Sequence, residues 1–166
     1  MVLLIEGADG TGKSTLIKNL VEQLDNARQF ACVPRGWPMQ KDYWDSLMYN
    51  INSERNIAII DRCFISELVY RSIKNDKLRN ISLSDVLELL NKSYVKIIYC
   101  HTDDAYKFAK LRGEDYIKTL EEASEIENMY KYLMLLFKNF SNAKIIEFDW
   151  QKDELKTLIK EIKNGN

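Results

Sequence analysis

Residues 7–15, Gly-Ala-Asp-Gly-Thr-Gly-Lys-Ser-Thr, have the types and spacing of a phosphate-binding loop, G-x-x-x-x-G-K-[ST]. The glycines let successive backbone N–H groups curl around a polyphosphate, and the ammonium group of Lys13 can reach its β- and γ-oxygens. The Ser14 hydroxyl can ligate Mg²⁺, and a helix that begins here directs its positive end at the anion. The sequence therefore predicts that the phosphates of a nucleoside triphosphate, with Mg²⁺, are bound by the loop residues Gly7, Ala8, Asp9, Gly10, Thr11, Gly12, Lys13, Ser14 and Thr15.

Two segments flank this loop as the chemistry requires. An apolar run at residues 2–5 precedes it, and an amphipathic stretch at residues 16–24 follows it. A phosphate loop joins a buried strand to a helix, whereas a chance match in a flexible turn, the alternative interpretation, has no reason to be flanked by both. We therefore expect the chain to bind a nucleoside triphosphate.

Short apolar runs alternate with helical patterns along the whole chain. Runs that are apolar at nearly every position are typical of strands buried on both faces of a parallel sheet. The sequence predicts an α/β protein: a three-layer sandwich with a five-stranded parallel sheet, of the P-loop nucleoside triphosphate hydrolase or kinase type, in a single domain over residues 1–166. The expected strands lie at 2–5, 30–33, 57–60, 95–99 and 144–148, and the expected helices at 13–25, 40–52, 62–74, 84–92, 103–111, 119–139 and 152–163.

Composition narrows the remaining classes. The 166 residues carry a net charge of −1, which gives no electrostatic reason to bind a nucleic-acid backbone, and no apolar segment approaches the length of a membrane span. Three widely separated cysteines are expected to be small buried side chains in a reduced, cytoplasmic protein. A single histidine without a C-x-x-C partner argues against a zinc site.

Charged residues follow several of the expected strands. Arg35 follows the second run, and Asp61 and Arg62 follow the third. Because the carboxyl ends of parallel strands meet at one edge, we expect these side chains to lie near the phosphate loop. Asp61 could ligate Mg²⁺ directly or through water, or cap the next helix, and Arg62 could bridge the phosphates of a donor and an acceptor. A surface ion pair with Glu67 is the alternative for Arg62.

The phosphate loop alone does not separate switch GTPases, transport ATPases and small-molecule kinases. A GTPase needs N-K-x-D to read guanine, but residues 91–94 read Asn-Lys-Ser-Tyr and precede the fourth run. The transporter signature L-S-G-G-Q is absent from the sequence. A kinase that transfers a γ-phosphoryl group to a small acceptor remains.

Two segments carry a family resemblance. Residues 6–15, Glu-Gly-Ala-Asp-Gly-Thr-Gly-Lys-Ser-Thr, resemble the E-G-x-D-G-x-G-K-[ST]-T loop of thymidylate kinases. Residues 61–70, Asp-Arg-Cys-Phe-Ile-Ser-Glu-Leu-Val-Tyr, resemble that family's D-R-[YFH]-x-x-S-x-x-A-Y segment. The likeness covers most of the chain in element order and is greatest to the compact phage-type members. It implies ATP-dependent phosphorylation of a deoxynucleoside monophosphate, dTMP or a 5-substituted dUMP.

The resemblance also implies roles for individual residues. The Asp9 carboxylate would face the sugar of the acceptor, and Arg112 would be the cation of a mobile lid over about residues 110–118. Arg35 is a candidate for the acceptor phosphate, because a planar guanidinium matches two phosphate oxygens. The expected catalytic residues are Lys13, Asp61, Arg62 and Arg112; the metal ligands are Ser14 and Asp61; the substrate-binding residues are Asp9, Arg35, Trp37, Arg62, Ser66, Tyr70 and Tyr116.

The sequence departs from the family pattern in places. Arg71 occupies the position of a base-reading glutamine, the lid has one arginine, and residues 38–56 have room for one helix where longer members have two. A deoxynucleoside kinase is the main alternative. In such kinases, which resemble this fold, a glutamate after the second strand is the general base, and Arg35 occupies that place here. A non-catalytic nucleotide-binding module and a kinase acting on modified bases in DNA are further alternatives. Two copies of the chain could pair through the helices at 62–74 and 84–92.

Overall fold

The computed structural model describes residues 1–31, 57–73, 82–91, 94–113 and 117–164. Its sheet has five strands in the order β2-β3-β1-β4-β5, and every neighbouring pair is parallel. The sheet therefore confirms the predicted five-stranded parallel arrangement. The strands are β1 (Val2–Glu6), β2 (Ala27–Ala31), β3 (Ile57–Asp61), β4 (Val95–Cys100) and β5 (Lys144–Phe148).

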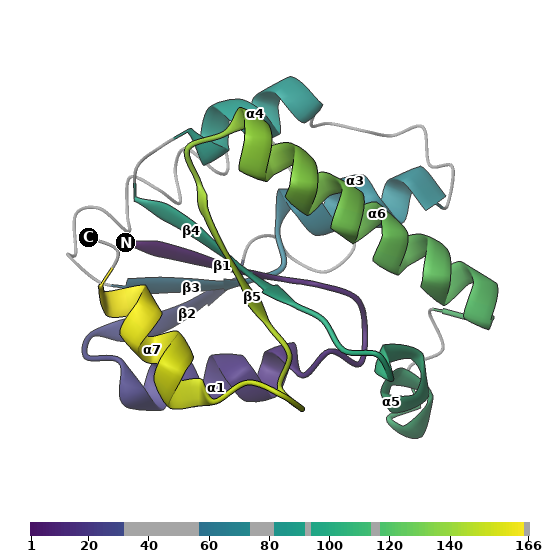
Figure 1. The fold of residues 1–166 in the computed structure, drawn as a ribbon, viewed down its shortest axis with the longest axis horizontal. Coiled ribbons are helices and arrows are strands. Elements are labelled where there is room, and N and C mark those ends of the chain that lie inside the picture. Colours follow the sequence, from purple (N-terminus) through teal and green to yellow (C-terminus); the bar gives the residue numbers. More distant parts are fainter. Residues whose placement is uncertain (32–56, 74–81, 92–93, 114–116, 165–166) are drawn as a thin grey trace.

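Helices cover both faces of the sheet (Figure 1). α1 and α7 pack on one face, α3, α4 and α6 pack on the other, and each face has its own apolar core. α5 lies beyond the carboxyl end of β4 (Figure 1). The helices are α1 (Lys13–Gln23), α3 (Phe64–Ile73), α4 (Leu83–Leu90), α5 (Ala105–Leu111), α6 (Leu120–Phe140) and α7 (Leu155–Lys163).

β1 is the central strand and delivers the phosphate loop. All five of its residues are buried, and it pairs with β3 on one side and β4 on the other. α1, which follows the loop, buries Leu16, Ile17 and Leu20 against the sheet. These apolar contacts fix both ends of the loop, so its conformation is set by the core rather than by the loop alone.

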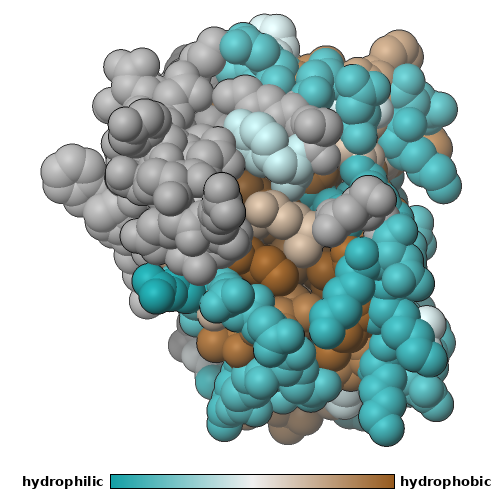
Figure 2. All heavy atoms as spheres, turned by 90° about the vertical axis from the view of Figure 1, so that its left-hand side faces the viewer, coloured by the Kyte–Doolittle hydropathy of each residue, from teal (hydrophilic) through white to brown (hydrophobic). Residues whose placement is uncertain are grey.

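The two ends of the sheet differ. Figure 2 looks at the end where the strands begin and shows apolar side chains surrounded by hydrophilic ones in the described part of the surface. The phosphate loop and the turns after β3, β4 and β5 lie at the opposite end, where α5 also sits (Figure 1). No helix in the described ranges is long and apolar enough to cross a lipid bilayer.

Element boundaries agree with the sequence in most places. β2 begins at Ala27 rather than at residue 30, and the helix expected at 40–52 lies outside the described residues. Ser82 and Asp85 form a complete capping box at the start of α4. At the start of α6 the Thr119 side chain accepts the Glu122 N–H, while the Glu122 carboxylate accepts the N–H of Lys118.

Candidate active site

Close packing shapes the phosphate loop. Gly7 and Gly10 have φ angles of +144° and +83°, which non-glycine residues rarely adopt. A Cβ atom on Gly7 would lie 2.1 Å from the carbonyl oxygen of Cys100, and one on Gly10 would lie 2.0 Å from that of Ala105. The loop therefore contacts the end of β4 and the first turn of α5 so closely that only glycine fits at both positions.

Lys13 is the first residue of α1 and a buried cation. Its side chain is 7% exposed, and its Nζ donates to the Ala8 carbonyl oxygen at 2.5 Å and to Thr11 Oγ1 at 3.4 Å. The Thr11 hydroxyl also donates to the Ala8 carbonyl, at 2.8 Å. Burial, followed by the charge of Arg62, lowers the pKa of Lys13 to about 8. The ammonium group therefore contacts the phosphate loop itself, at the place where a bound phosphate is expected.

Arg62 directly follows β3 and has a left-handed backbone, with φ +55°. Its guanidinium forms an ion pair with Asp9 in the phosphate loop and lies 5.1 Å from the ring centroid of Tyr70. The Tyr70 hydroxyl donates to the other Asp9 oxygen at 3.1 Å. The structure therefore brings together three of the residues that the sequence singled out, Asp9, Arg62 and Tyr70. The alternative that Arg62 pairs with Glu67 is wrong, because Glu67 pairs with Arg71.

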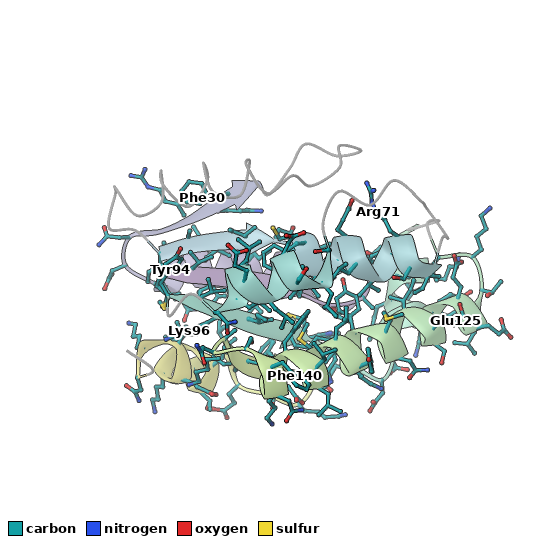
Figure 3. The ribbon with its side chains drawn as sticks, turned by 90° about the horizontal axis from the view of Figure 1, so that it is seen from above. Phe30, Arg71, Tyr94, Lys96, Glu125 and Phe140 are labelled. Carbon is teal, nitrogen blue, oxygen red and sulfur yellow. The ribbon has the colours of Figure 1, made fainter. Side chains whose placement is uncertain are left out.

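Glu6 and Ser66 form a second polar cluster directly beneath the loop. Glu6 is fully buried; its Oε1 accepts the N–H of Cys63 at 2.8 Å and its Oε2 accepts the Ser66 hydroxyl at 2.5 Å. The Ser66 Oγ also lies 2.7 Å from the Tyr130 hydroxyl, which joins α3 to α6. Burial raises the pKa of Glu6, opposed by these hydrogen bonds and by the charges of Arg62 and Lys13. Figure 3 shows α3 and α6 next to each other over the sheet.

The predicted metal ligands have suitable chemistry and placement. Ser14 is exposed on the first turn of α1, and Asp61 is half-buried at the carboxyl end of β3. β3 pairs with β1, so Asp61 lies beside Ile5, next to the start of the loop. A hydroxyl and a carboxylate are hard oxygen donors of the kind that Mg²⁺ prefers. The donor types therefore suit a magnesium ion at this end of the sheet, and the binding of one ion by both residues stays a prediction.

Trp150 lies against the phosphate loop, and the sequence analysis did not single it out. It follows β5, and a Cβ on Gly12 would lie 2.8 Å from its indole ring. Its ring meets Phe108 of α5 edge-on at 5.1 Å, and it remains 43% exposed. One signal could have found it: Trp150 follows the fifth apolar run and so lies at the same sheet edge as the loop.

Two further predicted site residues, Arg112 and Ser66, lie in the described ranges. Arg112 is exposed at the end of α5, and no hydrogen bond or ion pair joins it to the phosphate loop within the described ranges. Ser66 is buried with its hydroxyl between Glu6 and Tyr130, so it lies inside the protein rather than on the rim. Arg35, Trp37 and Tyr116 lie outside the described residues.

The cysteines differ from one another. Cys100 is a buried free thiol, and burial raises its pKa to about 12. Cys63 is also buried but is disulfide-bonded, so the expectation of reduced thiols is wrong for this residue. Separation along the chain did not reveal this, because cysteine pairing depends on the distances that the fold creates.

This protein matches known proteins by its structure and not by its sequence. No protein-family model and no curated protein matches the chain by sequence. The YorR protein of Bacillus subtilis, in complex with phosphorylated GDP, matches in structure with a TM-score of 0.72 at 21% identity, over 98% of this chain and 93% of that one. Deoxyadenosine kinase from M. mycoides with bound dATP matches with a TM-score of 0.60 at 19% identity, over 99% and 98%. Thymidylate kinase from Candida albicans matches with a TM-score of 0.60 at 15% identity, over 99% and 93%.

The chain folds like a nucleotide kinase. These identities are low, so the matches establish the fold rather than the substrate. They confirm the predicted α/β kinase fold and the resemblance to thymidylate kinases that the motifs indicated.

Proposed function

We propose that this protein transfers the γ-phosphoryl group of ATP to a deoxynucleoside monophosphate, with dTMP or a 5-substituted dUMP as the acceptors that the motifs imply. The observation that carries the proposal is the position of Arg62. The turn after β3 sets its guanidinium against Asp9 of the phosphate loop, close enough for its charge to lower the pKa of Lys13. Two cations at one loop suit a reaction that joins two phosphate groups.

The residues divide the work by charge. Lys13 and the loop N–H groups would hold the β- and γ-phosphates of ATP, and Arg62 would contact the transferred group and the acceptor phosphate. Ser14 and Asp61 would hold Mg²⁺, which when bound neutralises charge on the phosphate oxygens. Catalysis of this kind relies on positioning and charge stabilisation and needs no covalent enzyme intermediate.

The rest of the proposed acceptor site has partial support. Tyr70 contacts Arg62 and Asp9. In the proposed site, its ring and the Asp9 carboxylate would form one wall beside the bound phosphates. The roles of Arg35 on the acceptor phosphate, of Trp37 and Tyr116 at the base, and of Arg112 as the lid cation stay predictions from the sequence. So does the pairing of two copies through the α3 and α4 region.

The main alternative is a deoxynucleoside kinase, a class that the structural matches also include. A hydroxyl acceptor needs a general base, whereas a phosphate monoester, with a second pKa of about 6, is already a nucleophilic anion at neutral pH. In the described part of the chain, the Asp9 carboxylate is engaged by Arg62 and Tyr70, and the Glu6 carboxylate is fully buried. These two carboxylates are thus already engaged or buried. The sequence has the cation Arg35 at the position where a nucleoside kinase would have its glutamate base, and this supports the monophosphate as acceptor.

The test compares acceptors that differ by one phosphate group. The protein is incubated with ATP and Mg²⁺, and with either dTMP or thymidine, and ADP formation is followed in a coupled assay. We expect turnover with dTMP and none above background with thymidine, while Lys13→Ala supplies the background rate. Turnover with thymidine and not with any monophosphate would overturn the proposal in favour of a nucleoside kinase.

A further inference from the structure

Glu6 is a buried charged residue without a part in the proposed phosphoryl transfer. It is the last residue of β1, directly before the phosphate loop, and it is fully buried. Burying a carboxylate is costly unless hydrogen bonds or charges compensate, so its surroundings indicate what it does. Both of its oxygens have protein partners, and both partners belong to the segment that starts α3.

The carboxylate of Glu6 acts as a cap for α3. The first N–H groups of a helix have no carbonyl partner within the helix. Glu6 Oε1 accepts the N–H of Cys63, directly before the helix, and Oε2 accepts the hydroxyl of Ser66 in its first turn. A negative group at this end of a helix is also favoured by the helix dipole. Glu6 therefore fixes the start of α3 relative to β1.

Arg62 directly precedes Cys63, the first of the two residues that Glu6 contacts. Its left-handed backbone, φ +55°, is unfavourable for a residue with a Cβ atom and persists only where the surroundings hold it. The Arg62 N–H donates to the Ile5 carbonyl oxygen at 3.0 Å, and the next N–H, that of Cys63, donates to Glu6 at 2.8 Å. Two consecutive residues of β1 thus hold the two consecutive N–H groups of the turn that directs the guanidinium to Asp9.

Contacts with α6 connect the Glu6–Ser66 pair to Arg62 through Tyr130 and Tyr70. The Ser66 Oγ lies 2.7 Å from the hydroxyl of the fully buried Tyr130. The Tyr130 ring meets the Tyr70 ring edge-on at 6.4 Å, and the Arg62 guanidinium lies over Tyr70. Side-chain contacts therefore join β1, α3 and α6 around the turn that carries Arg62.

We propose that Glu6 is a positioning residue, which holds Arg62 in the left-handed turn from which its guanidinium reaches the transferred phosphate. This inference rests on the function proposed above for Arg62. Glu6 acts through the hydrogen bonds that it accepts, and not through contact with a substrate. Ser66 and Tyr130 hold Glu6 in place, so their effects on Arg62 decrease with distance along the chain of hydrogen bonds.

The main experiment is a double-mutant cycle with four proteins: wild type, Glu6→Ala, Arg62→Ala and the double variant. We expect Glu6→Ala to lower kcat by at least about tenfold with less than a threefold change in the KM of ATP. In the Arg62→Ala background the same substitution should change kcat by less than about twofold, because the residue that it positions is gone. Full additivity of the two losses overturns the proposal, because Glu6 then acts independently of Arg62.

Conservative variants separate positioning from charge. In Glu6→Gln the amide oxygen can still accept the Cys63 N–H and the NH₂ group can donate to Ser66 Oγ, so we expect kcat within about fivefold of wild type. Ser66→Ala removes one of the two contacts of Glu6, so its kcat should lie between those of Glu6→Gln and Glu6→Ala. Tyr130→Phe should lower kcat least. A Gln variant as inactive as the Ala variant contradicts a role through hydrogen bonds.

Amide hydrogen exchange gives a readout that does not depend on turnover. We expect the Arg62 and Cys63 amides to exchange at least about tenfold faster in Glu6→Ala than in wild type, while the Leu4 amide in β1 is unchanged. If Glu6→Ala does not fold, the same exchange rates are compared between Ser66→Ala and wild type, and we expect a smaller increase. Unchanged exchange at Arg62 and Cys63 in a folded variant overturns the positioning role. A wild type that phosphorylates no acceptor overturns the proposed function, but exchange still decides whether Glu6 holds the turn.

Discussion

At the scale of single residues, Lys13 is a phosphate-loop cation whose protonation depends on its surroundings. Burial and the neighbouring Arg62 lower its pKa to about 8, so the free protein begins to lose this charge just above neutral pH. Bound phosphates would favour the charged ammonium and raise the pKa again. Binding of ATP must therefore be linked to uptake of a proton.

This linkage predicts a pH dependence of ATP affinity. Above pH 8 the free protein must take up a proton before Lys13 can bind phosphate, so the Kd should rise by up to roughly tenfold per pH unit. Near pH 8, about half a proton should be taken up per ATP bound. Titration calorimetry in buffers of different ionisation enthalpy measures both quantities, with Lys13→Ala as the control. A Kd that stays constant from pH 7.5 to 9.5 would place the Lys13 ammonium away from the phosphates.

Removal of the same side chain should abolish turnover and leave the fold intact. Lys13→Ala loses a cation that the proposed reaction needs, so kcat should fall on the order of 10³-fold or more. The ammonium is desolvated in the free protein, so we expect the melting temperature to stay within a few degrees. A variant that melts normally and turns over at the wild-type rate would show that the loop is not a phosphate site.

Site residues could be predicted from the sequence where they belong to a motif with a known spacing. The loop and the Asp61–Arg62 pair were predicted in this way, and the structure places Arg62 against Asp9. Glu6 was noted only as part of the family motif, and Ser66 was expected on the substrate rim. Their contact joins residues 60 positions apart, and such a distance depends on how β1 lies beside β3 rather than on local spacing.

At the scale of elements, the contact between the phosphate loop and α5 predicts a difference between two glycines. Gly10→Ala would place a Cβ 2.0 Å from the Ala105 carbonyl oxygen at a φ of +83°. Gly113→Ala would place one at a φ of +72° with no atom of the described residues within 4 Å. The first change should cost about 2–5 kcal/mol of stability from strain plus overlap, and the second about 1–2 kcal/mol from strain alone. Urea unfolding of both variants measures the difference; equal losses would show that α5 does not lie against the loop.

The start of α4 allows a test of local structure away from the site. Ser82→Ala removes the side chain that accepts the Asp85 N–H, so unfolding should become easier by about 0.5–2 kcal/mol. Ser124→Ala, at an exposed position within α6, is the matched control and should stay within about 0.5 kcal/mol of wild type. Thermal denaturation of the two variants checks the cap, and equal stabilities would contradict it.

Element boundaries show where sequence patterns lose information. β1, buried on both faces, was predicted almost to the residue. β2 starts earlier than expected because Arg28 and Gln29 are polar but still belong to the strand: it is an edge strand, and these two side chains are exposed. An exposed edge strand can contain polar residues, so the apolar run starts later than the strand does. A central strand is buried and apolar along its length, so its start is easier to recognise.

At the scale of the whole molecule, the order of the strands creates the site. β1 lies between β3 and β4, so the loop after β1 meets Asp61 and Arg62 from one neighbour and the end of the other at Cys100. The sequence predicted that these segments share one edge, because all strands run parallel. The order of the strands was not predicted, since short apolar runs do not specify their neighbours.

The most direct measurement of the central claim follows the phosphoryl group itself. ATP labelled with ³²P at the γ-position is incubated with the protein, Mg²⁺ and dTMP, or with each of the other deoxynucleoside monophosphates, and the labelled products are separated. The account predicts that the label moves to a deoxynucleoside diphosphate in wild type and stays on ATP in Lys13→Ala. Label recovered only as inorganic phosphate, or on a nucleoside but never on a monophosphate, would contradict it.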